Sequence, residues 1–319
     1  MHQYILQRLL IAIPTVFGVT VLIFLAMRVI PGDPLQTIYT ESTGAYILSE
    51  EELAEVRASL GLDKPLWQQY LSWMGQVFRG EMGYSFWTKD PISQMILRRG
   101  PISAQIAFFA VVLSWLFGVP IGLLSAWFRN SWADQVSRAG ITLFLAVPSF
   151  WLGLLIILFT VLVLTWRPPL TIIQFWEDPG GNFAIVALPS ITLGLGLGAA
   201  TARMARSAAL EALFDDYVRT ARAKGLGNSL IIWRHVFKNA MLPVITSTGL
   251  ALGGLLGGTV SVEKAFPVPG LGSLMVQGMQ ERDWMMIQNL VLVYGLIYVF
   301  VNLLVDLSYG MLDPRIRYS

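Results

Sequence analysis

The side chains that most often do chemistry in proteins are scarce in this 319-residue sequence. It contains no cysteine, and its two histidines, His2 and His235, are too far apart in the sequence to indicate a metal site. No lysine follows a glycine, so the loop that cradles nucleotide phosphates with backbone N–H groups and a lysine is absent. We therefore expect no catalytic residue, no metal and no cofactor in this chain.

Two further patterns could suggest chemistry. The glycine run Gly194–Gly198 is half of a dinucleotide fingerprint, but it lies within an apolar run and no strand precedes it, which favours close helix packing. Asp306 is the one carboxylate within an apolar run that we expect to span a membrane. Because ionisable groups there are costly, we expect Asp306 and nearby Asn302 to be buried, hydrogen-bonded or ion-paired rather than bound to substrate.

Positive charge is concentrated in one place. The stretch from Asp216 to Ile245 holds five basic residues in a chain that is 55% hydrophobic and 13% charged: Arg219, Arg222, Lys224, Arg234 and Lys238. A net charge of +2 would be a weak indication of nucleic-acid binding in a soluble protein, but here the distribution of charge matters more than its sum. We expect no nucleic-acid partner.

The elements that must position this charge are membrane helices. A mean hydropathy of +0.61 excludes an ordinary soluble protein and predicts an all-α integral membrane protein. A transmembrane helix needs about 20 apolar residues. Six such runs are present: Leu9–Met27, Ile102–Trp127, Ile141–Leu164, Phe183–Ala202, Ala240–Val260 and Met285–Leu307. The first run is too long for a signal-peptide core and lacks a cleavage site, so we expect a retained anchor.

Loop charges predict the orientation and the domain organisation. Arginine and lysine are enriched in the segments that are cytoplasmic if the N-terminus is inside, so both termini are expected to be cytoplasmic. We expect a first transmembrane helix (residues 1–30), an external insert (31–100), a five-helix core (101–311) and a cytoplasmic tail (312–319). The core includes a cytoplasmic loop at 203–238.

The external insert is expected to form two short amphipathic helices. Ser49 and Glu52 form a capping box for the first of them. Its aromatic residues are expected to lie at the membrane interface rather than to cap the helix bundle. They are Trp67, Tyr70, Trp73 and Phe78.

The cytoplasmic loop is expected to form an amphipathic helix and a turn. Apolar residues recur at helical spacing from Leu210 to Ala221, and charged residues occupy the other face. Gly225 and Gly227 are expected to end this helix as C-cap residues. Asn228 or Ser229 then offers an N-cap for the next helix. Positive-inside charge on an ordinary loop would explain the arginines, but it would not explain the apolar stripe.

These residues resemble a known family. The stretch RTARAKGL followed by RHVFKNAMLPVI is similar to the cytoplasmic loop of bacterial ABC-importer permeases of the dipeptide, oligopeptide and nickel type. MRVIPGDP, VPSFWLG, VEKAFPVPGLG and NLLVDLSYGMLDPRIRY occur in the same order as in the family. The resemblance covers essentially the whole chain and is closest to the B-type subunit, which has an external insert after the first helix.

The resemblance implies a type I ABC importer permease fold and several functional residues. The coupling helix, which docks on an ATPase subunit, would comprise Asp216, Tyr217, Val218, Arg219, Ala221, Arg222 and Gly225. Pore and gate candidates are Pro148, Phe150, Trp151, Gly249, Gly253, Gly257, Phe266, Pro269 and Gly270. The glycine row in the fifth span suggests either a close helix contact or a path for solute.

The resemblance also implies partners. It implies a second homologous permease subunit, two cytoplasmic ATPase subunits that bind ATP and magnesium, an external solute-binding protein, and membrane lipid. The expected cargo is a peptide, with nickel or another small solute as the alternative. A channel or ion-coupled transporter is a rival, but it should have more carboxylates in its spans than Asp306 alone. A membrane scaffold is a third candidate, which would not need a glycine-lined span.

Overall fold

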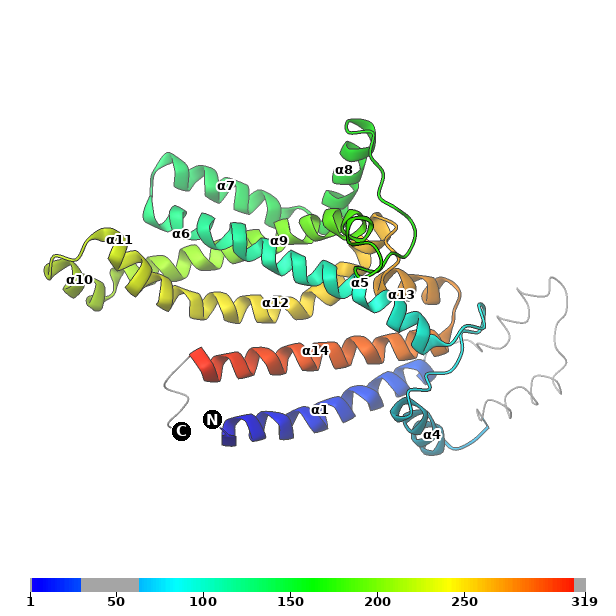
Figure 1. The fold of residues 1–319 in the computed structure, drawn as a ribbon. Helices are drawn as coiled ribbons and strands as arrows, with labels where there is room; N and C mark the ends of the chain where they lie inside the picture. The colour runs from blue at the N-terminus through cyan, green and yellow to red at the C-terminus, as the bar shows by residue number, and fades with distance from the viewer. Residues whose placement is uncertain (1, 30–62, 313–319) are drawn as a thin grey trace.

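The structure, a computed structural model, describes residues 2–29 and 63–312. The described chain is built from helices, with longer connections at residues 79–91 and 163–178 (Figure 1). They are α1 (His2–Val29), α4 (Leu66–Phe78), α5 (Ile92–Leu113), α6 (Val119–Trp127), α7 (Trp132–Ala146), α8 (Ser149–Leu162), α9 (Pro179–Phe214), α10 (Asp216–Ala223), α11 (Asn228–Ile231), α12 (Phe237–Ala265), α13 (Leu271–Gln280) and α14 (Trp284–Leu312). π-helical turns at Ser114–Gly118 and Ile232–Val236 join α5 to α6 and α11 to α12.

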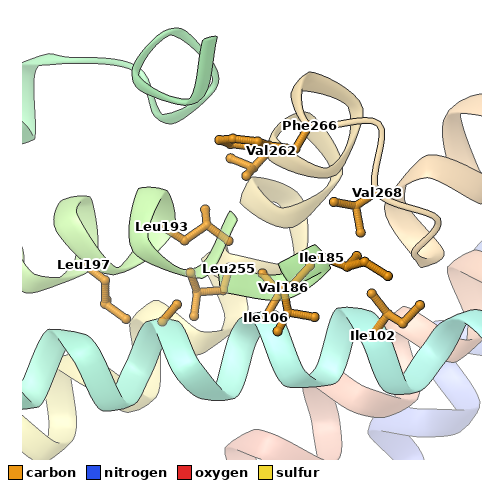
Figure 2. Close-up of a cluster of buried hydrophobic side chains, with 11 residues drawn as sticks. Ile102, Ile106, Ile185, Val186, Leu193, Leu197, Leu255, Val262, Phe266 and Val268 are labelled. Carbon is orange, nitrogen blue, oxygen red and sulfur yellow. The ribbon is translucent and has the colours of Figure 1, made fainter. Parts of the chain in front are cut away.

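Helix α9 is the centre of the bundle, where it packs against α5, α6, α7, α8 and α12 (Figure 1). Its 36 residues extend about 54 Å, well beyond the ~30 Å hydrocarbon core of a bilayer. Figure 2 shows the main apolar cluster, where α5, α9, α12 and the segment after α12 meet. Its labelled members are Ile102, Ile106, Ile185, Val186, Leu193, Leu197, Leu255, Val262, Phe266 and Val268.

Four helical segments of the described chain are long and apolar enough to cross a membrane, and the number rises to six if each of two bent pairs is one span. The four are 6–29, 92–127, 179–214 and 284–307, and the bent pairs join α7 with α8 and the two parts of α12. All six fall on the apolar runs of the sequence. The second span begins at Ile92, ten residues before the expected start and within the expected external insert.

The third span differs from the single run expected at Ile141–Leu164, because the structure breaks it into two helices. Helices α7 and α8 meet at 101°, and α8 turns sharply away from α7 in Figure 1. Proline lacks an N–H group and disfavours helical geometry at the preceding residue. Val147 (ψ 124°) and Pro148 (ψ 137°) are both extended, so the chain leaves the helix for two residues and starts again at Ser149.

Helices α1 and α14 lie side by side at the edge of the bundle, and α4 packs across α1 (Figure 1). Two of the four aromatic residues expected to form a belt pack against α1. Trp73 is buried against Phe24, and the Tyr70 hydroxyl lies 2.7 Å from Thr20 Oγ1. Trp67 and Phe78 are exposed. The expected capping box at Ser49 lies outside the described residues.

Candidate functional site

The first part of the basic stretch, Asp216–Ala223, forms a short helix, α10, at the same end of the bundle as the start of α1 and the end of α14 (Figure 1). The expected single helix from Leu210 to Ala221 is wrong, because α9 ends at Phe214 and Asp215 is extended (φ −66°, ψ 152°). The carbonyl of Asp215 then accepts the first hydrogen bonds of α10. An aspartate favours such a helix-start position, so the apolar stripe is divided between two helices.

The apolar face of α10 points inward rather than towards a partner. Val218 and Ala221 are buried in a cluster with α9 and the start of α12, and Tyr217 is half-buried there. The outward face is charged: the side chains of Asp216 and Arg219 are 95% and 73% exposed and lie 3.4 Å apart. Arg222 is also exposed. The residues expected to contact an ATPase therefore fall into two groups. Tyr217, Val218 and Ala221 hold α10 against the bundle, whereas Asp216, Arg219 and Arg222 form its exposed charged face.

Gly225 ends α10 in the left-handed conformation, with φ of +75°. Its N–H donates to the Arg222 carbonyl at 2.9 Å, and the Leu226 N–H donates to the Ala221 carbonyl at 3.2 Å. These two bonds form a Schellman motif, a C-terminal cap that glycine favours. Gly227 has no positive φ and instead precedes α11, so its expected capping role is wrong. The side chains of Asn228 and Ser229 lie outside the described residues.

A polar contact links α10 to the start of α12. The Asn239 side-chain amide donates to the Tyr217 hydroxyl at 2.8 Å and to the His235 carbonyl at 3.0 Å. The rings of Tyr217 and His235 have centroids 6.3 Å apart. Because His235 belongs to the π-helical turn before α12, this contact joins α10 to the helix that continues into the membrane.

A buried ion pair that sequence reasoning missed supports the same end of the bundle. Arg206 of α9 donates to Asp134 of α7 through Nε (2.9 Å) and through its NH2 atom (3.0 Å). Asp134 is fully buried and also accepts from Ser125 Oγ at 2.6 Å and from the Asn130 N–H at 3.1 Å. The sequence did contain a local signal for Asp134: Ser131, three residues earlier, is an N-cap residue, and it caps α7. The 72 residues between Asp134 and Arg206 concealed their pairing.

The expected gate segment is organised around a second buried carboxylate that sequence reasoning missed, Glu263. Helix α12 continues past the expected end at Val260, and this brings Glu263 against Ser103 of α5, whose hydroxyl donates to it at 2.6 Å. Gly270 is buried beside both, and a Cβ atom there would clash with the Glu263 carboxylate. Phe266 is buried in the apolar cluster, and Pro269 is half-buried.

The expected glycine row of the fifth span serves helix packing in the described structure. A Cβ atom on Gly249 would lie 2.5 Å from Val305, and one on Gly253 would lie 2.2 Å from Tyr298. Both glycines therefore allow α12 to approach α14 closely. The environment of Gly257 lies outside the described side chains.

The remaining candidates are dispersed. Pro148 begins α8, where Phe150 and Trp151 are roughly half exposed. Asp306 forms an ion pair with Arg8 of α1 at 3.1 Å, with side chains 30% and 38% exposed. Asn302 donates to the Tyr298 carbonyl at 3.0 Å. Asp306 is thus ion-paired and Asn302 hydrogen-bonded, as expected, but neither is buried, so the expectation of burial is wrong.

A cavity of about 270 Å³, with a mainly apolar lining that includes several polar residues, lies between α9 and α12, on a face that the sequence did not indicate. Its polar lining residues are Thr201, Arg203 and Ser207 of α9 and Ser247 and Thr248 of α12. Leu197, Met204 and alanines line the rest. None of these polar residues was among the pore candidates.

The described residues form a multi-span all-helical bundle with a capped helix at one end, the architecture of a multi-pass membrane protein. Residues 118–318 match the binding-protein-dependent transport system inner membrane component family, and residues 1–107 match the N-terminal region of such components. The chain belongs to this family.

Relatives and solved structures agree with this assignment. A putative peptide transport system permease protein of Brucella abortus is 37% identical over all of both chains. The glutathione transport system permease protein GsiC of Escherichia coli is 36% identical, also over all of both chains. A structure of the MetNI methionine ABC transporter in an inward-facing conformation has a TM-score of 0.54 at 17% identity, and covers 69% of this chain and 97% of that chain. The type I ABC importer permease fold is therefore correct.

Proposed function

We propose that this chain forms half of the translocation pore of an ATP-driven importer for peptides. A second homologous permease subunit supplies the other half, and an external solute-binding protein delivers the cargo. Two cytoplasmic ATPase subunits bind and hydrolyse ATP. The names of the full-length relatives, which include peptide and glutathione permeases, support this class of cargo.

The observation that carries the proposal is the construction of α10. It is a capped helix whose apolar face is held by α9 and the start of α12 and whose charged face is free. When an ATPase subunit pushes on such a helix, the force reaches both α9 and α12 through packed side chains. ATP-driven closure of the ATPase pair therefore moves the permease helices between inward-facing and outward-facing states, with α10 as the coupling helix.

The orientation follows from the same end of the bundle. The proposed cytoplasmic end carries α10, the start of α1, the end of α14 and the connection between α6 and α7. Arg129 and Arg138 lie in or near that connection, in agreement with the enrichment of basic residues in cytoplasmic loops. Helices α4 and α13 then lie at the external end, where cargo arrives.

Three carboxylates of the described residues are buried: Asp134, Glu263 and Asp283. Asp283, just before α14, accepts from Ser85 Oγ and from the N–H groups of Phe86 and Met286. Asp134 and Glu263 reopen the question of an ion-coupled transporter, which uses such groups. Both are already bound to donors within the chain. Asp134 is held by Arg206, Ser125 and the Asn130 N–H, and Glu263 is held by Ser103 and a backbone N–H group. A carboxylate engaged in this way serves structure, so these residues favour the ATP-driven importer.

The test is uptake of labelled peptide into proteoliposomes that contain the complex purified through this chain. We expect uptake that requires both ATP and the external binding protein. Uptake driven by a proton or sodium gradient without ATP, or saturable ATP binding by the purified chain alone, would contradict the proposal.

A further inference from the structure

The cavity between α9 and α12 contains an unpaired cation. Arg203 lines it, and among the residues that the structure describes this guanidinium has neither an ion-pair nor a hydrogen-bond partner. Arg206, three residues further along α9, is by contrast fully engaged with Asp134. Arg203 is exposed, so its guanidinium is accessible to an anion that enters the cavity.

Hydroxyl groups lie around Arg203 in the same lining. Thr248 Oγ1 accepts from the Trp115 indole at 3.1 Å and donates to the Val244 carbonyl at 2.9 Å. Ser247 Oγ donates to the same carbonyl at 3.1 Å. Thr201 and Ser207 lie on the α9 side. Each hydroxyl group has one donor and two acceptor sites, and the donors of Ser247 and Thr248 are used on the Val244 carbonyl, so the capacity that remains on this wall is to accept hydrogen bonds from N–H groups of a ligand.

We infer that this cavity is a transient binding station for the terminal carboxylate of the transported solute. A guanidinium binds a carboxylate through two parallel N–H···O bonds, which no hydroxyl group can replace. The volume of about 270 Å³ lies near the lower limit of ligand pockets, so it suits one end of a peptide rather than the whole molecule. A single exposed arginine binds weakly, which permits release. The inference rests on the proposed function, because the carboxylate belongs to the peptide that the proposed importer would carry.

The test uses the full complex and a cysteine introduced as Ser247→Cys in this otherwise cysteine-free chain. Its rate of alkylation by a neutral maleimide is measured with trialanine, with trialanine amide, and with phosphatidylglycerol. We expect trialanine to slow the reaction and its amide to have little effect. Arg203→Gln in the same background should raise the trialanine concentration needed for half-maximal slowing of alkylation by about fivefold. That factor is the upper range for an exposed ion pair. Arg203→Lys should lie between the two.

Arg138→Gln is the matched control, because it removes the same charge from an exposed position on α7 outside the cavity. It should leave protection by trialanine unchanged. Equal protection by acid and amide, no protection by either, or protection by phosphatidylglycerol alone would overturn the inference, the last by assigning the cavity to a lipid phosphate. Peptide uptake by the same preparations separates the two claims. Uptake without protection contradicts only the binding station, whereas absence of ATP-dependent uptake contradicts the proposed function.

Discussion

The Oε2 atom of Glu263, at the end of α12, accepts a hydrogen bond from the backbone N–H of Ser273 at 3.0 Å. Ser273 is the third residue of α13, and the N-cap residue Gly270 has no side chain to satisfy the first N–H groups of that helix. The Ser103 hydroxyl of α5 receives the Leu271 N–H at 2.8 Å. The start of α13 is therefore capped by two other helices, which fixes its position.

This capping predicts the behaviour of Glu263→Gln. The amide has one acceptor oxygen and its NH2 group only donates, so it cannot accept from both the Ser103 hydroxyl and the Ser273 N–H as the carboxylate does, and the cap is weakened. Loss of a helix cap costs about 1 kcal/mol, which should speed hydrogen exchange at the first turn of α13 roughly fivefold. Glu211→Gln, the same change at an exposed position on α9, is the control. Unchanged exchange in the Glu263 variant would show that the carboxylate does not cap α13.

The buried pair of Asp134 and Arg206 predicts a large loss of stability on Asp134→Asn. The guanidinium of Arg206, whose side chain is 20% exposed, would lie beside a neutral group, and removal of one charge from a buried pair costs about 3 kcal/mol, an upper figure for this partly exposed arginine. Asp216→Asn removes one charge from the exposed pair with Arg219 and should have little effect. Thermal unfolding in detergent measures both, and equal shifts would contradict the prediction.

The sequence predicted what depends on local pattern. Apolar runs located the four long helices and the two bent pairs. Gly225 marked the end of a helix, and the structure gives this residue a φ of +75°. The sequence could not predict contacts between distant residues. Ser103 and Glu263 are separated by 160 residues, and only their meeting explains why a carboxylate is tolerated there.

The sequence also could not predict the direction in which a helix face points. The stripe with Val218 and Ala221 was expected to contact a partner, but an apolar stripe fits a partner and the chain's own core equally well. The glycines of α12 left the same ambiguity, and the structure places Gly249 and Gly253 against α14. One consequence is that Ala221→Asp would destabilise the fold, so it cannot report on docking alone.

The proposed orientation is tested with single cysteines. Lys89→Cys, in the connection before α5, should react with an impermeant thiol reagent added outside intact cells. Gln135→Cys, on α7 near the opposite end, should react only after the membrane is permeabilised. Both positions are exposed in the structure, so burial does not explain a difference. The reverse pattern would invert the proposed topology.

The hydrogen bond between Tyr217 and Asn239 predicts a shared effect on coupling. Tyr217→Phe and Asn239→Ala each remove the 2.8 Å bond between α10 and α12, worth about 1 kcal/mol. We expect each to lower the peptide transported per ATP hydrolysed, and the double variant to lose no more than the worse single variant. Thr220→Ala removes a bond within α10 only and is the control. Additive losses would mean that the two residues act separately.

The last prediction compares two neighbouring glycines, Gly225 and Gly227. Gly225→Ala places a Cβ atom on a residue with φ of +75°, which costs about 1–2 kcal/mol for a left-handed residue. A Cβ atom at either position would meet no other atom within 4 Å, so crowding does not contribute. Gly227→Ala has no positive φ to strain and should behave like the parent chain. The strain at Gly225 opposes the Schellman cap and should loosen the end of α10, so ATP hydrolysis by the complete complex in proteoliposomes should become less dependent on cargo and less productive in uptake. Because the change lies outside the spans, the complex should still assemble in the membrane. If the Gly225 variant transports at the parental rate with normal stimulation, the cap is dispensable and α10 is not the coupling helix.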